Sequence, residues 1–158
     1  MINTHYYLTY YYLLYLYYLL AHLYCYLSHF DYRQDLQFEP CRYSIEEGYE
    51  ATLHLLKRNP SLTAIFAFGD IIAFGAMRAI RDLGKRIPED ISLVGYDGID
   101  FSRFSIPRLT TIRQDTSQMA KQGVDLMLQR IHYPYKAVHK IIPYELVKSE
   151  SVKKINEN

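Results

Sequence analysis

The chain has 158 residues, and its 18 lysines and arginines against 17 acidic residues leave a formal net charge of +1. That length suffices for one domain with a buried core. The balanced charge excludes a general polyanion binder, which needs a basic excess to neutralise phosphates. The two cysteines, Cys25 and Cys41, exclude a disulfide-stapled scaffold and lack metal-site spacing. We therefore expect neither a metal nor a cofactor.

Residues 1–30 form an anomalous, low-complexity segment rich in tyrosine and leucine. Ten tyrosines and eight leucines fall within residues 1–28, and no charged residue precedes Asp31. The length suits a membrane span, but tyrosine prefers the membrane interface to its centre. A signal peptide needs a basic start and a small-residue cleavage site, and this segment has neither. We favour a third interpretation, an out-of-frame stretch of an AT-rich gene, and expect no membrane association.

From Asp31 onward the composition is that of an ordinary globular protein, and the first elements follow one another closely. Ser44 followed three residues later by Glu47 is a capping box that predicts a helix ending before Asn59. The apolar run at residues 63–68 predicts a strand buried on both faces. We expect Asp70 to cap the next helix, over residues 71–83.

The remaining elements continue the alternation of strand and helix. Strands are predicted at residues 91–96 and 109–112, a helix from residue 116 to 131, and a last strand within 140–147. The chain from Lys148 is expected to be frayed. This order predicts an α/β fold in which helices flank a parallel sheet.

Two acidic residues follow neighbouring strands of that sheet, where ligands of open α/β folds bind. Asp70 comes after the first strand and Asp97 after the second. The pair fits three roles: an acid and base, a Mg²⁺ site as in phosphatase-like enzymes, or acceptors for ligand hydroxyls. Asp70 can equally be a helix cap and Asp97 a turn residue before Gly98. The enzyme interpretation lacks the further acids and the partner Lys and Ser/Thr that such sites require.

Four segments resemble the LacI/GalR family of bacterial transcription regulators. They are residues 63–76 (TAIFAFGDIIAFGA), 84–97 (GKRIPEDISLVGYD), 107–114 (PRLTTIRQ) and 145–152 (ELVKSESV). The resemblance implies a periplasmic-binding-protein-like I fold, in which two α/β subdomains clasp a small ligand. It assigns residues 31–152 to the C-terminal part of that sensing domain, a partial copy of the fold, and leaves 153–158 as a tail.

Within the matching motifs, the resemblance implies a set of ligand-binding positions. Tyr43 corresponds to an aromatic wall of the pocket, Asp97 to a carboxylate that contacts the ligand, and Gln114 to a polar pocket residue. Gly69 corresponds to a position where the family often has a polar side chain that contacts the ligand. Glycine has no side chain to make that contact. Asp70 is included among the ligand-binding positions as a helix cap that supports the residues contacting the ligand.

The resemblance also implies partners and a function. Phe74, Met77 and Phe104 are candidates for a homodimer surface, the alternative being that they pack inside the domain. We expect a cytoplasmic, truncated repressor fragment, not an enzyme, that senses a sugar or sugar phosphate. Operator DNA would be bound only through an N-terminal helix-turn-helix that the sequence lacks. The alternatives are an exported sugar-binding protein of the same fold and a non-functional product of a frameshifted repressor gene.

Overall fold

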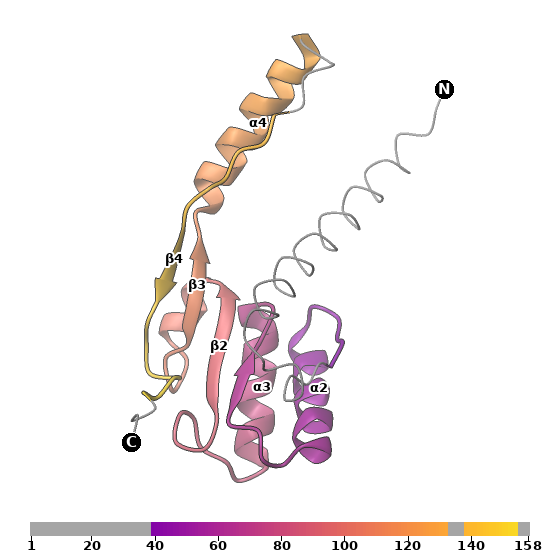
Figure 1. Cartoon of the computed structure of the whole chain (residues 1–158), viewed down its shortest axis with the longest axis vertical. Coiled ribbons are helices and arrows are strands. Elements are labelled where there is room, and N and C mark those ends of the chain that lie inside the picture. The colour runs from indigo at the N-terminus through magenta and orange to yellow at the C-terminus, as the bar shows by residue number, and fades with distance from the viewer. Residues whose placement is uncertain (1–38, 133–137, 155–158) are drawn as a thin grey trace, which may run out of the picture. The chain divides into compact units, whose positions relative to one another are not determined.

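The computed structural model describes residues 39–132 and 138–154, so the predicted boundary near residue 30 lies outside the described residues. Helices alternate with the strands of one sheet (Figure 1). The elements in chain order are α2 (Ile45–Arg58), β1 (Ala64–Phe66), α3 (Asp70–Asp82), β2 (Ser92–Asp97), the short 3₁₀ helix η1 (Asp100–Arg103), β3 (Thr110–Gln114), α4 (Thr116–His132) and β4 (Tyr144–Val147).

The start of α2 confirms the predicted cap. The Ser44 hydroxyl accepts a hydrogen bond from the Glu47 amide at 3.1 Å, which satisfies one of the free N–H groups of the first turn. The predicted cap of α3 is wrong. Gly69 holds the N-cap position without a side-chain hydrogen bond, and Asp70 is the first residue of the helix.

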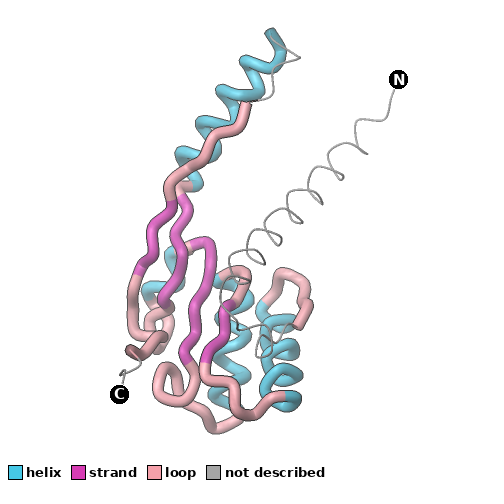
Figure 2. Tube along the Cα trace, in the orientation of Figure 1, coloured by secondary structure: helices cyan, strands magenta, loops and turns pink. Residues whose placement is uncertain are grey.

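The four strands form one sheet in the order β1-β2-β3-β4, seen side by side in Figure 2. The pairs β1–β2 and β2–β3 are parallel, as predicted, whereas β4 runs antiparallel to β3. The strand predicted at residues 63–68 is shorter in the structure, although the Ala67 amide still donates to the Val94 carbonyl at 2.8 Å. The prediction that it is buried on both faces is wrong: β1 is the edge strand of the described sheet, and Phe66 is 48% exposed. The carboxyl ends of the three parallel strands therefore share one edge.

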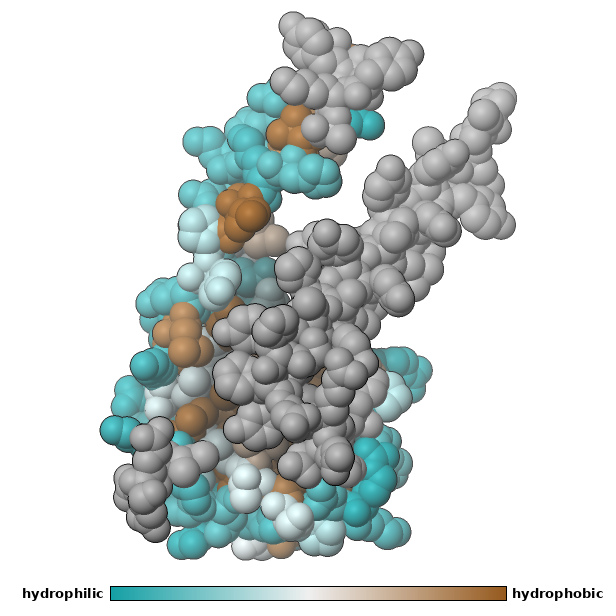
Figure 3. Space-filling model, viewed as in Figure 1, coloured by the Kyte–Doolittle hydropathy of each residue, from teal (hydrophilic) through white to brown (hydrophobic). Residues whose placement is uncertain are grey.

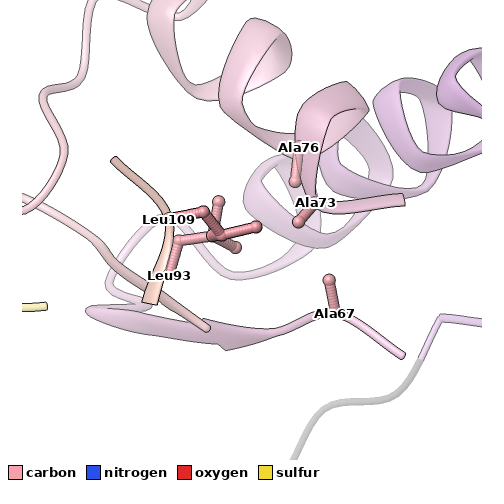
Figure 4. Packing of buried hydrophobic residues seen from close by; sticks show 5 residues of the cluster. All are labelled: Ala67, Ala73, Ala76, Leu93 and Leu109. Atoms are coloured by element: carbon pink, nitrogen blue, oxygen red, sulfur yellow. The ribbon is translucent and has the colours of Figure 1, made fainter. Parts of the chain in front are cut away.

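The core lies between α3 and the sheet. Small residues of the helix, Ala73 and Ala76, face Leu93 of β2 and Leu109, with Ala67 beside them (Figure 4). Alanine on the helix lets its backbone approach the strands closely, and the leucines fill the remaining volume. A second cluster of Leu56, Ile80 and Ile91 joins α2 to the same layer.

The chain beyond β4 is packed, which corrects the expectation of a frayed end from Lys148. Ser151 is fully buried; its hydroxyl donates to the Leu93 carbonyl at 2.6 Å and accepts from the Thr110 amide at 2.8 Å. The Glu150 carboxylate accepts from the Arg108 amide at 2.8 Å. These contacts hold the segment against the first residues of β2 and β3, where it supplies partners for backbone groups that the strands leave free.

Helix α4 carries apolar side chains that remain exposed. Hydrophobic atoms lie at the surface along this helix in Figure 3. The exposed residues are Met119, Val124, Met127, Leu128 and Ile131, with Ile131 at 74%. The Asp115 carboxylate accepts from the Gln118 amide at 2.8 Å and so caps the start of the helix. Other described residues do not cover this apolar stripe.

Candidate functional site

Asp97 lies at the carboxyl end of β2 in an unusual backbone conformation. Its φ is +107°, a region that L residues rarely adopt and that aspartate tolerates better than most. The next residue, Gly98, has φ +70°, and a Cβ there would lie 2.5 Å from the Arg113 Cα on β3. The tight turn therefore requires glycine at 98. Together the two residues turn the chain at the edge of the sheet and hold the Asp97 carboxylate in place.

Both oxygens of the Asp97 carboxylate accept hydrogen bonds from the predicted site residues. The Tyr43 hydroxyl donates to Oδ2 at 2.7 Å, and Gln114 Nε2 donates to Oδ1 at 3.0 Å. Tyr43 precedes α2, and Gln114 ends β3. Three residues from distant parts of the sequence thus converge, because the carboxyl ends of parallel strands meet at one edge.

The hydrogen bond to Asp97 changes the acidity of Tyr43. It raises the pKa of the phenol from 10.0 to about 12, with burial and the negative charges of Asp97 and Asp70 acting in the same direction. Each of these effects disfavours the phenolate, which would face a carboxylate. Tyr43 is therefore a hydrogen-bond donor at any ordinary pH, and its ring remains 58% exposed.

Gly69 provides the space in which the Tyr43 ring reaches Asp97. A Cβ at Gly69 would overlap Tyr43 Cε2 and would lie 3.2 Å from Cζ and 3.3 Å from Asp97 Oδ2. The backbone at Gly69 is extended, with φ −173°, so its conformation alone does not demand glycine. At position 69 the Tyr43 ring therefore occupies the space that a side chain would need.

Asp70 lies behind the site, completely buried. Its carboxylate accepts from the Ser102 hydroxyl at 2.6 Å, the Thr111 hydroxyl at 2.6 Å and the Ile99 amide at 2.9 Å. A Cβ on Gly95 would overlap Asp70 Oδ1, so β2 has glycine where the carboxylate packs against it. Asp70 therefore joins α3, β3 and the loop after Asp97, and it supports the site without reaching the surface.

A hollow of about 690 Å³ opens beside these residues. The predicted ligand-binding residues Tyr43, Asp97 and Gln114 lie in its lining. The other lining residues did not stand out in the sequence: Gly98, Ile99, Asp100, Arg103, Arg113 and Thr116. The volume lies within the range of about 300–1,000 Å³ typical of small-molecule sites. Arg113 could have been found from its position beside Gln114, whereas Arg103 and Asp100 enter through the 3₁₀ helix, which no pattern predicted.

The three candidates for a homodimer surface lie in different environments. Phe74 and Met77 are partly buried and pack against the core cluster around Leu93. Phe104 is 77% exposed, near Phe101 at 73% and Ile106 at 81%. The surface after η1 is thus the more accessible part of the predicted set.

Searches of the described residues for two other kinds of feature found nothing. In residues 39–132 and 138–154, no group of three or more His, Cys, Asp or Glu side chains is placed to hold a metal ion. Within those same ranges, no helix has both the length and the apolar character that crossing a membrane requires.

A family model described as "periplasmic binding protein-like domain" matches residues 11–152. The chain belongs to this family. The match begins at residue 11, inside the tyrosine- and leucine-rich stretch, whereas the resemblance to the LacI/GalR family was assigned to residues 31–152. Among curated relatives, the HTH-type transcriptional repressor PurR of Haemophilus influenzae is 40% identical over 122 residues. The HTH-type transcriptional regulator MalR of Clostridium butyricum is 40% identical over 109 residues. The resemblance to LacI-type regulators is therefore confirmed.

Solved structures of LacI-type regulators share the fold. A LacI family regulator of Enterococcus faecium with bound ribose is 35% identical, has a TM-score of 0.70, and is matched over 82% of this chain and 49% of its own. The lac repressor dimer bound to operator and an anti-inducer is 34% identical with a TM-score of 0.71, over 84% of this chain and 46% of its own. The match to the PurR relative covers 75% of this chain, which spans only 35% of that protein's length. The chain thus matches part of the effector-binding region of these regulators and spans about half or less of the length of each.

Proposed function

We propose that this chain forms the effector-binding and dimerisation part of a LacI-type transcriptional repressor that senses a small sugar-like ligand. The observation that carries the proposal is the convergence of Tyr43 and Gln114 on the Asp97 carboxylate at the edge of the sheet. An aromatic ring, a carboxylate and an amide around one open hollow are the groups that recognise a polyol.

The chemistry of each group suits that ligand. The Asp97 carboxylate accepts up to two hydrogen bonds from neighbouring hydroxyls, and such charged acceptors bind more strongly than neutral ones. Tyr43 and Gln114 each donate one hydrogen bond to this carboxylate, which fixes its orientation and leaves further lone pairs for ligand hydroxyls. The exposed Tyr43 ring offers an apolar face for the C–H groups of a sugar ring.

In this function the chain binds its ligand without catalysing a reaction, and it acts in the cytoplasm. Asp70 is buried and fully hydrogen-bonded, so it is not available as a second catalytic carboxylate. Operator DNA would be read by a separate helix-turn-helix domain.

The exposed apolar stripe of α4 would pack on the first subdomain of the sensor. Phe104, Phe101 and Ile106 would form part of a homodimer surface. In the complete repressor, ligand binding would shift the population between open and closed subdomain arrangements and so change operator affinity.

A ligand screen with one matched pair of variants tests the proposal. The full chain is titrated with ribose, lactose and cellobiose, and binding is followed by saturation-transfer NMR at millimolar sugar. We expect at least one sugar to bind, and Asp97→Asn to weaken it about tenfold by removing one charged acceptor. Asp82→Asn, at an exposed carboxylate on the last residue of α3, is the control and should leave binding unchanged. Binding that is equal in both variants would overturn the assignment of the site, and no binding of any sugar would overturn the ligand class.

A further inference from the structure

A second hollow, of about 230 Å³, lies between η1, β3 and the segment that follows β4. It shares Arg103 and Arg113 with the hollow that Asp97 lines, and it adds Arg108 and Lys148. Its volume is below the range of about 300–1,000 Å³ typical of sites for drug-sized ligands. The second hollow therefore suits a small group more than a whole disaccharide.

The charges around the second hollow are unlike those around the first. Four cationic side chains line it, and no carboxylate does so. The first hollow instead places Asp97 and Asp100 opposite Arg103 and Arg113. A small hollow whose charged lining residues are all cationic matches an anion, because guanidinium and ammonium groups have only hydrogen-bond donors to offer.

Three of the four cations have carboxylate partners on the outer surface. Arg103 contacts Asp100 at 2.6 Å, Arg108 contacts Glu150 at 2.7 Å, and Arg113 contacts Glu145 at 3.5 Å. These acids have exposed fractions of 49% to 87%, and exposed ion pairs contribute little because water and salt screen them. Within the described residues Lys148 has no carboxylate partner, so one cation remains in excess.

The rest of the lining is neutral, with the apolar Ile99, Leu109 and Val147 beside hydroxyl residues. Ser102 and Thr111, both buried, already donate their hydroxyls to Asp70, and that commitment fixes the wall of the hollow. Ser149 follows Lys148 and is held by its amide, which donates to the Thr110 hydroxyl at 2.9 Å. The Lys148 ammonium therefore starts from an anchored backbone, and less of its freedom is lost when it binds an anion.

We propose that the second hollow binds a phosphate-type dianion, either inorganic phosphate or the phosphate group of a small phosphate ester. Arg103, Arg108 and Arg113 supply planar, paired donors that match phosphate oxygens, and Lys148 supplies the unpaired charge. This inference goes beyond sugar sensing through Asp97. Inorganic phosphate contains no sugar, so its binding tests the second hollow independently of sugar recognition by Asp97.

The test is a titration of the full chain at constant ionic strength with inorganic phosphate, glucose 6-phosphate or glucose, followed by calorimetry. We expect both phosphates to bind saturably. Lys148→Gln should weaken them roughly three- to tenfold, and Lys148→Glu should abolish binding. Lys148 is exposed and makes no ion pair with the residues that the structure describes, so neither variant should unfold the chain. Lys57→Gln on α2, an exposed lysine outside both hollows, is the matched control.

The pattern of ligands identifies the natural source of the anion. If inorganic phosphate and glucose 6-phosphate bind equally well, the hollow recognises the phosphate alone. If glucose 6-phosphate binds more tightly than both phosphate and glucose, the ligand is a phosphate ester. The proposal is overturned if phosphate fails to saturate at constant ionic strength, or if Lys57→Gln weakens binding as much as Lys148→Gln.

Discussion

Replacing Asp70 by alanine should destabilise the fold more than any other single change near the site. The carboxylate accepts three hydrogen bonds, of 2.6, 2.6 and 2.9 Å, from Ser102, Thr111 and the Ile99 amide. The two hydroxyl residues are 3% and 2% exposed, so water cannot readily replace the lost acceptor. Asp70→Ala therefore leaves three donors unsatisfied and opens a small cavity.

The magnitude follows from the cost of each stranded group. A buried donor without a partner costs about 1–3 kcal/mol. Hydroxyls can rotate toward other acceptors, so we take the lower part of that range for three donors, which gives a loss of about 3–5 kcal/mol. This is a large fraction of the roughly 5–15 kcal/mol that stabilises a typical domain. Asp70→Asn keeps one acceptor oxygen and the side-chain volume, so its loss should be about half as large.

Urea unfolding followed by circular dichroism measures the effect, with Asp100→Ala as the matched control. Asp100 is also near the site, but its side chain is 87% exposed and pairs only with Arg103, so its removal should cost less than about 1 kcal/mol. Combining Asp70→Ala with Thr111→Val should cost less than the sum of the two single changes, because both remove the same hydrogen bond. A loss for Asp70→Ala no larger than that for Asp100→Ala would refute the reasoning.

Two further predictions concern Tyr43. Gly69→Ala should displace the Tyr43 ring and break its hydrogen bond to Asp97, which should lower sugar affinity several-fold. The loss of stability should be less than about 1 kcal/mol, because Tyr43 is exposed and can rotate away. Calorimetry measures the affinity and urea unfolding the stability of the same variant, and an unchanged affinity would contradict this role of Tyr43. The raised pKa of Tyr43, about 12 against 10.0 when unfolded, means that the folded state retains the phenolic proton longer. Its contribution to stability is complete below pH 10 and is lost as the pH rises from 10 to 12. Tyr43→Phe should therefore remove one titrating group from the ultraviolet difference spectrum near pH 12. It should also make the decline of stability above pH 10 less steep. An unchanged dependence of stability on pH would show that the hydrogen bond to Asp97 does not form in solution.

Much of the fold was predictable because its determinants are local. The capping box at Ser44 and Glu47 places the start of α2, and apolar runs locate β1 and β2 along the chain, although β1 is not buried. Tyr43, Asp97 and Gln114 were selected through a family resemblance, and the structure brings them together. Neither composition nor periodicity contained that long-range relation, since the three residues are far apart in the sequence.

The errors arise where a long-range contact overrides a local preference. Asp70 has the residue type and position of a helix cap, yet its carboxylate bonds to β3 and to the loop after Asp97 instead. Ser151 lies in a polar, charged stretch that reads as a frayed end, and only pairing with β2 and β3 shows that it is buried. The antiparallel direction of β4 depends on where the chain returns to the sheet, which no local pattern determines.

The measurement that tests the central claim most directly is a map of the sugar-binding site by ¹⁵N-resolved NMR of the full chain, using the tightest-binding sugar of the screen. The account predicts that amide shifts move at Asp97, Gly98 and Gln114 and at the residues beside Tyr43, and that they stay in place at the far end of α2. Shifts that move elsewhere, or that move equally in Asp97→Asn, would contradict an effector site built on this carboxylate.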